Sequence, residues 1–173
     1  MINTDQIVIA GINDIPALTV LVNSAYRGDS SKKGWTTEAD LLDGVRTDSD
    51  SLLTMLQNPG SVILKYIDTQ GRLLGCVYLQ KKQTKLYLGM LTVLPELQAR
   101  GIGKQLLAAA ENYAKQNNCT AITMTVISVR EELIAWYERH GYRGTGETEP
   151  FPTSPAFGLP KQPLHFIVME KPI

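Results

Sequence analysis

Residues 92–107, TVLPELQARGIGKQLL, constrain the fold more than any other stretch of the chain. They begin as the end of a strand, turn at Pro95, and continue as a helix that starts with Gly101 and Gly103. A helix entered through glycines exposes free backbone N–H groups at its positive end, where anions bind. A second β-branched run, AITMTVI at residues 121–127, follows this helix. The order of strand, helix and strand predicts a parallel strand pair with an anion site at the head of the helix.

The glycine turn fits a diphosphate, because glycines let the backbone approach a bulky anion while Arg100 and Lys104 add positive charge. The alternative is a tight turn with Lys104 in solvent, and for an isolated Gly-x-Gly this alternative would be preferred. A nucleotide P-loop does not fit, since it needs four residues before the Gly-Lys pair and a Ser or Thr where Gln105 stands. A dinucleotide-binding turn does not fit either, because Leu106 replaces its third glycine.

The remaining patterns predict a mixture of helices and strands. Apolar alternation and β-branched clusters predict further strands at residues 6–11, 61–67, 73–81, 85–93 and 164–171. Three- and four-residue apolar spacing, with caps such as Asp14 and Gly141, predicts helices at residues 14–28, 36–45, 49–57, 101–117 and 131–141. The hairpin signal DTQGR and the short turn KQT make residues 61–93 an antiparallel meander. The proline-rich residues 145–163 are expected to form a loop.

Composition limits the classes of function. A chain of 173 residues without repeats or a linker predicts a single domain over residues 1–173. The 17 basic and 17 acidic residues balance, which argues against nucleic acid or an anionic membrane as the partner. No run has membrane-span length and no signal-peptide pattern opens the chain, so we expect a cytoplasmic protein. Cys76 and Cys119 lack partners at ligand spacing, so neither a metal site nor a disulfide is expected.

Two motifs resemble those of the GNAT superfamily of acyl-CoA-dependent N-acetyltransferases. Gln98-x-x-Gly101-x-Gly103 at the head of a helix is similar to the acyl-CoA signature, and AWYERHGY is similar to the second motif, Tyr-x-x-x-Gly-aromatic. The order of elements also agrees over nearly the whole chain. The resemblance implies an α/β (α+β) fold with an antiparallel N-terminal meander, a splayed parallel central strand pair and flanking helices. It also implies acetyl-CoA as co-substrate, with the pantetheine arm paired to the fourth strand in the V-shaped gap.

The same resemblance implies roles for individual residues. The implied cofactor-binding residues are Leu91, Thr92, Val93, Gln98, Ala99, Arg100, Gly101, Ile102, Gly103 and Lys104. Tyr137 is the implied catalytic residue, as a hydrogen-bond donor to the departing thiolate, because a phenol of pKa about 10 does not fully protonate a thiolate whose acid has a pKa of about 8.5. The alternative, that Tyr137 is only a packing residue, stays open. A backbone N–H near Leu91, freed by a bulge, is expected to polarise the acetyl carbonyl.

The identity of the general base stays open at this point, because the strand at residues 85–93 contains no carboxylate. Glu132, Glu147 or His165 could approach the acceptor amine, a water chain could carry the proton, or the enzyme could bind the neutral fraction of the amine. Arg130 stands where many members of the family carry Asn. We expect it either to meet a CoA phosphate or to lie in solvent.

The expected acceptor is the primary amine of a small or amino-acid-like molecule, which attacks acetyl-CoA directly in a ternary complex. The residues expected to bind it come from the first helices and the proline-rich loop: Tyr26, Arg27, Trp35, Arg46 and Phe151, with Phe157 closing the site. Arg27 and Arg46 could hold an acceptor carboxylate. The alternatives are a protein or peptide N-acetyltransferase and a catalytically silent acyl-CoA sensor. We expect a monomer or a homodimer.

Overall fold

A mixed β-sheet organises the molecule. In the residues that the computed structural model describes (5–27, 37–43, 46–98, 100–152 and 159–173), its seven strands have the order β1-β3-β4-β5-β6-β9-β7. The strands are β1 (Gln6–Ile9), β3 (Ser61–Ile67), β4 (Leu73–Lys82), β5 (Lys85–Val93), β6 (Ala121–Ile127), β9 (His165–Pro172) and β7 (Arg143–Pro150). All neighbours are antiparallel except β5 and β6, which are parallel. The predicted meander and the predicted parallel pair are therefore confirmed.

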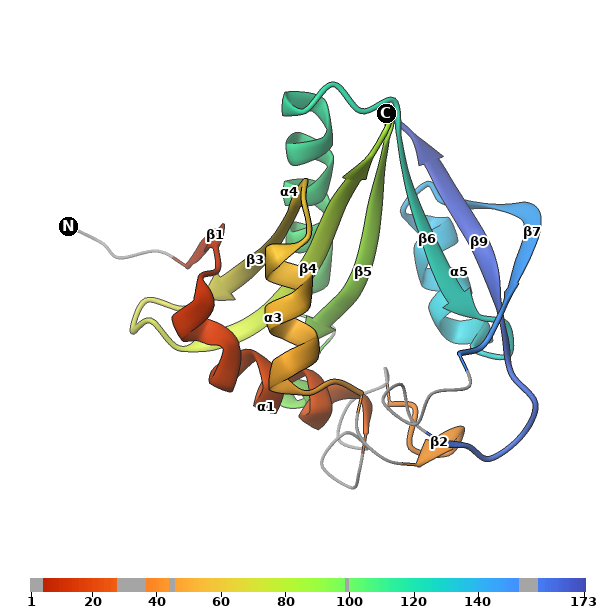
Figure 1. The fold of residues 1–173 in the computed structure, drawn as a ribbon, viewed down its shortest axis with the longest axis horizontal. Helices are drawn as coiled ribbons and strands as arrows, with labels where there is room; N and C mark the ends of the chain where they lie inside the picture. Colours follow the sequence, from red (N-terminus) through yellow and green to blue (C-terminus); the bar gives the residue numbers. More distant parts are fainter. Residues whose placement is uncertain (1–4, 28–36, 44–45, 99, 153–158) are drawn as a thin grey trace.

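The sheet splits into two halves between β5 and β6 (Figure 1). These strands pair over three residues, with Lys85 opposite Ala121 at the closed end and Tyr87 opposite Thr123 at the last pair. Beyond this point they diverge, and the gap widens toward the carboxyl ends of both strands (Figure 1). The splayed arrangement that the sequence predicted is thus present.

A β-bulge lies on β5 where the two halves separate. The β4–β5 register places Thr92 opposite Cys76 and Gly89 opposite Tyr78, so two residues of β5 face one residue of β4. Met90, one of these two, has a left-handed backbone with φ of 54°. The expected bulge near Leu91 is present, and it turns backbone groups of β5 out of the regular ladder.

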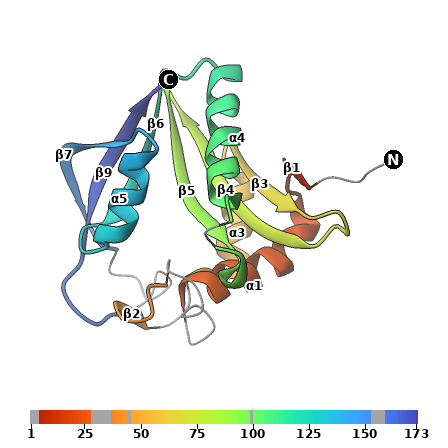
Figure 2. The ribbon, with the colours of Figure 1, turned by 180° about the vertical axis from the view of Figure 1, so that it is seen from behind.

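Helices cover both faces of the sheet. Helices α1 (Ile15–Tyr26) and α3 (Ser49–Gln57) pack on one face, and α4 (Ile102–Gln116) and α5 (Glu131–Arg139) pack on the other (Figures 1 and 2). Alternate residues of the central strands enter the two cores: Cys76 lies in the core with α1, whereas its neighbour Val77 lies in the core with α4. Among the described residues, no helix combines the length and the apolar character that crossing a membrane requires.

The prediction of a helix at residues 36–45 is wrong for the described residues 37–43. Residues 37–41 form turns and irregular backbone, and β2 (Leu42–Asp43) pairs with β8 (Leu159–Pro160). The reason is tertiary, because the Glu38 N–H donates to the Tyr26 carbonyl at 2.7 Å and the Glu38 carboxylate is buried against Arg27. These contacts outweigh the helical preference of the sequence.

The loop predicted at residues 145–163 is also partly wrong. Its first residues belong to β7, an edge strand that pairs with β9. All eight residues of β7 are exposed, so the strand shows no alternation of buried and exposed side chains. Its register against β9 shifts between Gly144 and Thr148, and a sequence pattern of half-buried strands could not reveal such an edge.

Candidate active site

A cavity of about 600 Å³ lies between the end of β5, the glycine turn and α5, and we call it the glycine-turn cavity. Seven of the residues predicted to bind the cofactor line it: Leu91, Val93, Gln98, Gly101, Ile102, Gly103 and Lys104. The opposite wall comes from α5 and includes Trp136, Tyr137 and His140. The structure therefore brings the two sequence motifs together on one cavity.

Two described residues of the predicted cofactor set, Thr92 and Arg100, do not line this cavity. Thr92 is buried, and its hydroxyl donates to the Met90 carbonyl at 2.8 Å. Arg100 is exposed and does not line the cavity. Ala99 lies outside the described residues.

The two glycines of the turn meet different requirements. Gly101 precedes α4 with φ of 86°, a left-handed backbone that favours glycine. At Gly103 space is the limit, because an added Cβ would lie 3.3 Å from the Trp136 ring. The Gln98 side-chain amide donates to the Val93 carbonyl at 3.1 Å and ties the turn to β5.

The first turn of α4 has no side-chain cap. Gly101 occupies the N-cap position and offers no acceptor atom, whereas most helices place Ser, Thr, Asp or Asn there. The exposed N–H groups of this turn are left for water or for an anionic ligand. Lys104 lines the cavity beside them. This arrangement fits the diphosphate that the sequence analysis expected.

A second cavity of about 290 Å³ lies on the other side of β5, between α1, β6 and β7, and we call it the arginine cavity. Four of the residues predicted to bind the acceptor line it: Tyr26, Arg27, Arg46 and Phe151. The Phe151 ring stacks on Phe166 with a centroid distance of 5.2 Å. Trp35 and Phe157 lie outside the described residues.

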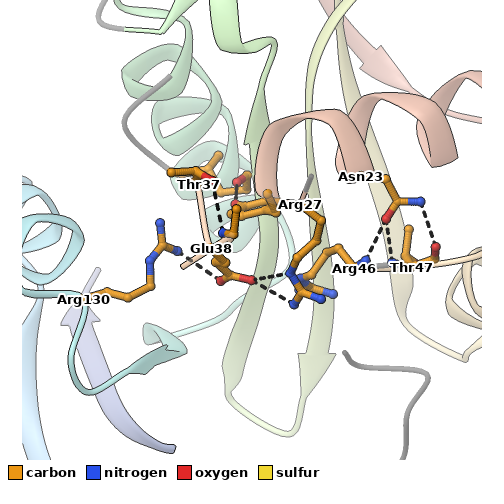
Figure 3. Close-up of polar contacts among 10 residues, drawn as sticks. Asn23, Arg27, Thr37, Glu38, Arg46, Thr47 and Arg130 are labelled. Carbon is orange, nitrogen blue, oxygen red and sulfur yellow. Dashed lines mark hydrogen bonds and ion pairs between the residues drawn. The ribbon is translucent and has the colours of Figure 1, made fainter. Parts of the chain in front are cut away.

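An ion-pair network crosses this cavity (Figure 3). Glu38 accepts from Arg27 at 2.9 Å through one carboxylate oxygen and from Arg130 at 3.1 Å through the other. All three side chains are at most 8% exposed. Burial lowers the pKa of the Arg27 guanidinium, and the Glu38 carboxylate opposes that shift. The sequence analysis expected Arg130 either to meet a CoA phosphate or to lie in solvent. The structure instead places it in a buried ion pair with Glu38.

Arg46 belongs to the same group of charges. Its guanidinium lies 5.8 Å from the centroid of the Tyr26 ring, and the guanidinium of Arg130 lies 5.9 Å from the same centroid. The backbone of Arg46 is fixed from α1, because its N–H donates to the Asn23 side-chain oxygen at 2.8 Å (Figure 3). Asn23 also holds the backbone of Thr47 through two further hydrogen bonds.

The two cavities share four lining residues: Tyr26, Leu91, Leu133 and Tyr137. The Tyr26 hydroxyl donates to the Leu91 carbonyl beside the bulge. Burial raises the pKa of Tyr26 to about 12, although Arg130 opposes this shift. Burial also raises the pKa of Tyr137 well above its ordinary value, and in the described part of the chain its hydroxyl has no hydrogen-bond partner. Both phenols are thus protonated donors at neutral pH, and that of Tyr137 is available to a ligand.

The carboxylates and histidine considered as general base are dispersed. Glu132 lines the glycine-turn cavity, whereas Glu147 and His165 line neither cavity. His165 is exposed, with its Nδ1 atom 3.3 Å from the Ser128 hydroxyl. Glu149, which the sequence analysis missed, lines the arginine cavity. It lies on β7, the strand that was predicted as a loop, so no pattern indicated which way it faces.

Comparison with known families agrees with this geometry. The sequence profile of the acetyltransferase (GNAT) family matches residues 18–142. The chain belongs to this family. GNAT acetyltransferases use acetyl-CoA, and the matched residues contain both sequence motifs and the glycine turn. No individual curated protein matches the chain in sequence.

Solved structures share the GNAT fold over almost their whole length. The ribosomal-protein-S18-alanine N-acetyltransferase from Escherichia coli has a TM-score of 0.72 at 16% identity, covering 98% of this chain and 94% of that one. PaiA N-acetyltransferase from Thermoplasma acidophilum, in complex with coenzyme A, has a TM-score of 0.69 at 19% identity, covering 98% and 99%. Nourseothricin acetyltransferase has a TM-score of 0.68 at 17% identity, covering 98% of both chains. Two of these names refer to different acceptors, ribosomal protein S18 alanine and nourseothricin, so the shared fold leaves the acceptor open.

Proposed function

We propose that this GNAT protein transfers the acetyl group of acetyl-CoA to the primary amine of a small or amino-acid-like acceptor. The observation that carries the proposal is the meeting of the two cavities at Leu91 and Tyr137. One cavity has the uncapped glycine turn that suits a diphosphate, and the other has the charged and aromatic lining that suits a small polar molecule. Two substrates that enter from opposite sides of β5 would meet at this point, which supports direct attack in a ternary complex.

The glycine turn would hold the co-substrate. The N–H groups at the start of α4 and the Lys104 side chain suit the diphosphate, and the open side of β5 at Leu91 and Val93 suits the pantetheine amides. A backbone N–H at the bulge near Leu91 is the candidate donor to the acetyl carbonyl oxygen. Acetyl-CoA itself supplies the activated thioester.

Tyr137 is our candidate for the residue that assists the leaving sulfur. It lines both cavities, and burial raises the pKa of its hydroxyl well above the ordinary value. The raised pKa makes full proton transfer to a thiolate unfavourable, so Tyr137 acts as a hydrogen-bond donor. A donor of this kind stabilises charge that develops mainly in the transition state.

Glu149 is our candidate for the group that takes the proton of the acceptor ammonium, directly or through water. Two glutamates line the described part of the arginine cavity, and Glu38 is already engaged by Arg27 and Arg130. A base must reach the acceptor rather than the co-substrate, which favours Glu149 over Glu132.

The test is release of free thiol from acetyl-CoA in the presence of a panel of primary amines. The proposal expects amine-dependent thiol release together with acetylated amine in equal amounts. A protein that binds acetyl-CoA but releases no thiol with any amine would be a silent acyl-CoA sensor, and the proposed transfer would be wrong.

A further inference from the structure

Among the described residues, more positive than negative side chains line the arginine cavity. Arg27, Arg46 and Arg130 line it, and the described carboxylates in its wall are Glu38 and Glu149. Both oxygens of Glu38 are used, one by Arg27 and one by Arg130. No oxygen of Glu38 is therefore left for a third guanidinium group, and a buried cation without a partner is costly.

Among the described residues, Arg46 is the member of this group that has no carboxylate partner. In the described part of the chain, its guanidinium forms no ion pair and its contact is with the Tyr26 ring. Burial lowers the pKa of Arg27 most, and the charges of Arg46 and Arg130 lower it further, so both of these groups repel the Arg27 guanidinium. An anion between them would remove this repulsion and use the planar donor geometry of arginine.

Tyr26 connects these arginines to the point of acetyl transfer. Its ring lies within 6 Å of the guanidinium groups of Arg46 and Arg130, and its hydroxyl reaches the Leu91 carbonyl where the two cavities join. The ring of Tyr26 thus lies beside the arginines, and its hydroxyl lies at the proposed transfer point. An acceptor with its amine at the transfer point would have its other end, a few bonds away, beside the arginines.

We infer that the acceptor is a primary amine that also carries a compact anionic group such as a carboxylate, and that Arg46 is the residue that selects it. This inference rests on the proposed function and specifies its acceptor. The rest of the cavity wall includes Met90, Met124 and Phe151, which suits an acceptor with an apolar remainder.

The experiment compares matched acceptors that differ in this anion. L-phenylalanine is compared with L-phenylalaninamide and 2-phenylethylamine, and L-leucine with L-leucinamide and 3-methylbutylamine, by thiol release from acetyl-CoA. All reactions are run at equal concentrations of the neutral amine, so that differences in amine pKa do not decide the result. We expect kcat/KM for the amino acids to exceed that for their amides and decarboxylated amines by roughly ten- to a hundredfold.

Two variants test whether Arg46 causes the preference for amino acids over their amides. Arg46→Gln should reduce kcat/KM for the amino acids to about the level of the amides, mainly through the acceptor KM, and leave the amides and the KM of acetyl-CoA unchanged. Arg72→Gln is the matched control, since Arg72 lies on the exposed β3–β4 hairpin with its side chain 68% exposed. It should preserve the whole preference.

The possible failures are distinct. Amides and decarboxylated amines that react as well as the amino acids would overturn the inference and leave the proposed transfer standing. An Arg46→Gln variant whose kcat/KM falls equally for all acceptors would also overturn the inference, because Arg46 would then support the fold or the binding of the co-substrate. No thiol release with any amine would overturn the proposed function, and the inference with it.

Discussion

At the scale of single residues, Tyr137 allows a packing role of the ring to be distinguished from a catalytic role of the hydroxyl. Its ring packs edge-on against Trp136 and Tyr142, with centroid distances of 5.2 and 5.8 Å, so the ring itself is structural. Tyr137 lines both cavities, and its hydroxyl has no hydrogen-bond partner among the described residues. Packing by the ring and hydrogen bonding by the hydroxyl can therefore be tested separately.

Tyr137→Phe keeps the ring and removes the hydroxyl. If the hydroxyl stabilises the departing thiolate, the turnover number should fall roughly ten- to a hundredfold, as expected for a lost hydrogen bond to a charged group. Acetyl-CoA affinity and melting temperature should barely change, because the interaction is made mainly in the transition state. An unchanged turnover number, with chemistry shown to be rate-limiting, would leave Tyr137 as a packing residue.

Gly103→Asp tests the glycine turn. The new side chain would meet the Trp136 ring and place a negative charge at the positive end of α4, so acetyl-CoA binding should be lost. Calorimetric titration with acetyl-CoA measures the effect. Gly144→Asp is the control, since a Cβ at Gly144 meets nothing within 4 Å and the residue lines neither cavity. Equal affinity in both folded variants would refute a diphosphate site at this turn.

Glu149→Gln tests the proposed general base. The variant should lose roughly a hundredfold to ten-thousandfold in rate near neutral pH, which is the usual contribution of general acid–base catalysis. The loss should shrink as pH rises, because more of the acceptor amine in solution is then already neutral. Glu147→Gln, on the same strand but lining neither cavity, should behave as the parent protein. A pH-independent loss in Glu149→Gln would indicate acceptor binding rather than proton transfer.

At the scale of elements, the segment at residues 37–43 links both halves of the molecule. Glu38 joins it to the end of α1 through Arg27 and to the start of α5 through Arg130, and β2 joins it to β8. The sequence has helical preference here, yet the segment connects elements that are distant in sequence (Figure 3). The buried ion pairs of Glu38 hold it in this conformation.

Glu38→Ala should therefore destabilise the fold. Removing one partner of a buried ion pair typically costs about 3–5 kcal/mol, because the remaining charge stays buried without compensation. Chemical denaturation measures the loss of unfolding free energy. Asp68→Ala removes the partner of the exposed Arg72, and the loss of this surface ion pair should cost far less, apart from the turn hydrogen bonds of Asp68. Equal losses in the two variants would show that the Glu38 network adds nothing beyond a surface pair.

At the scale of the whole molecule, the split sheet leaves a cavity between its two halves. The two halves share three paired residues between β5 and β6, and the glycine-turn cavity has one wall from each half. A ligand in this cavity contacts β5 and α4 on one side and α5 on the other. Binding should therefore stabilise both halves together.

Coenzyme A at a hundred times its dissociation constant should raise the melting temperature. Mass action gives about 2.7 kcal/mol, and for a domain of this size 1 kcal/mol corresponds to roughly 2–4 °C, so the shift should be roughly 5–10 °C. Differential scanning fluorimetry measures it, and hydrogen exchange should slow in both β5 and α5. Protection confined to β5 would argue against a ligand that spans the two halves.

The sequence by itself determined the parts of the molecule that depend on neighbours along the chain. Residues 49–57, 61–67, 85–93 and 121–127 form the elements predicted for them, with the same bounds, because apolar periodicity and caps act over a few residues. The glycine turn was predictable for the same reason, since left-handed backbone and close approach are local requirements.

Only the tertiary structure decided the arrangement of the arginine cavity. Arg27, Arg46 and Arg130 come from three separate segments, and no local pattern indicates that Arg27 and Arg130 share one buried carboxylate. The structure places these two arginines against Glu38 and Arg46 beside the Tyr26 ring. It also pairs β2, in a segment predicted as a helix, with β8, and it brings Glu149 of an exposed edge strand to the cavity wall. Burial of charge depends on partners that are distant in sequence, and no local pattern encodes those partners.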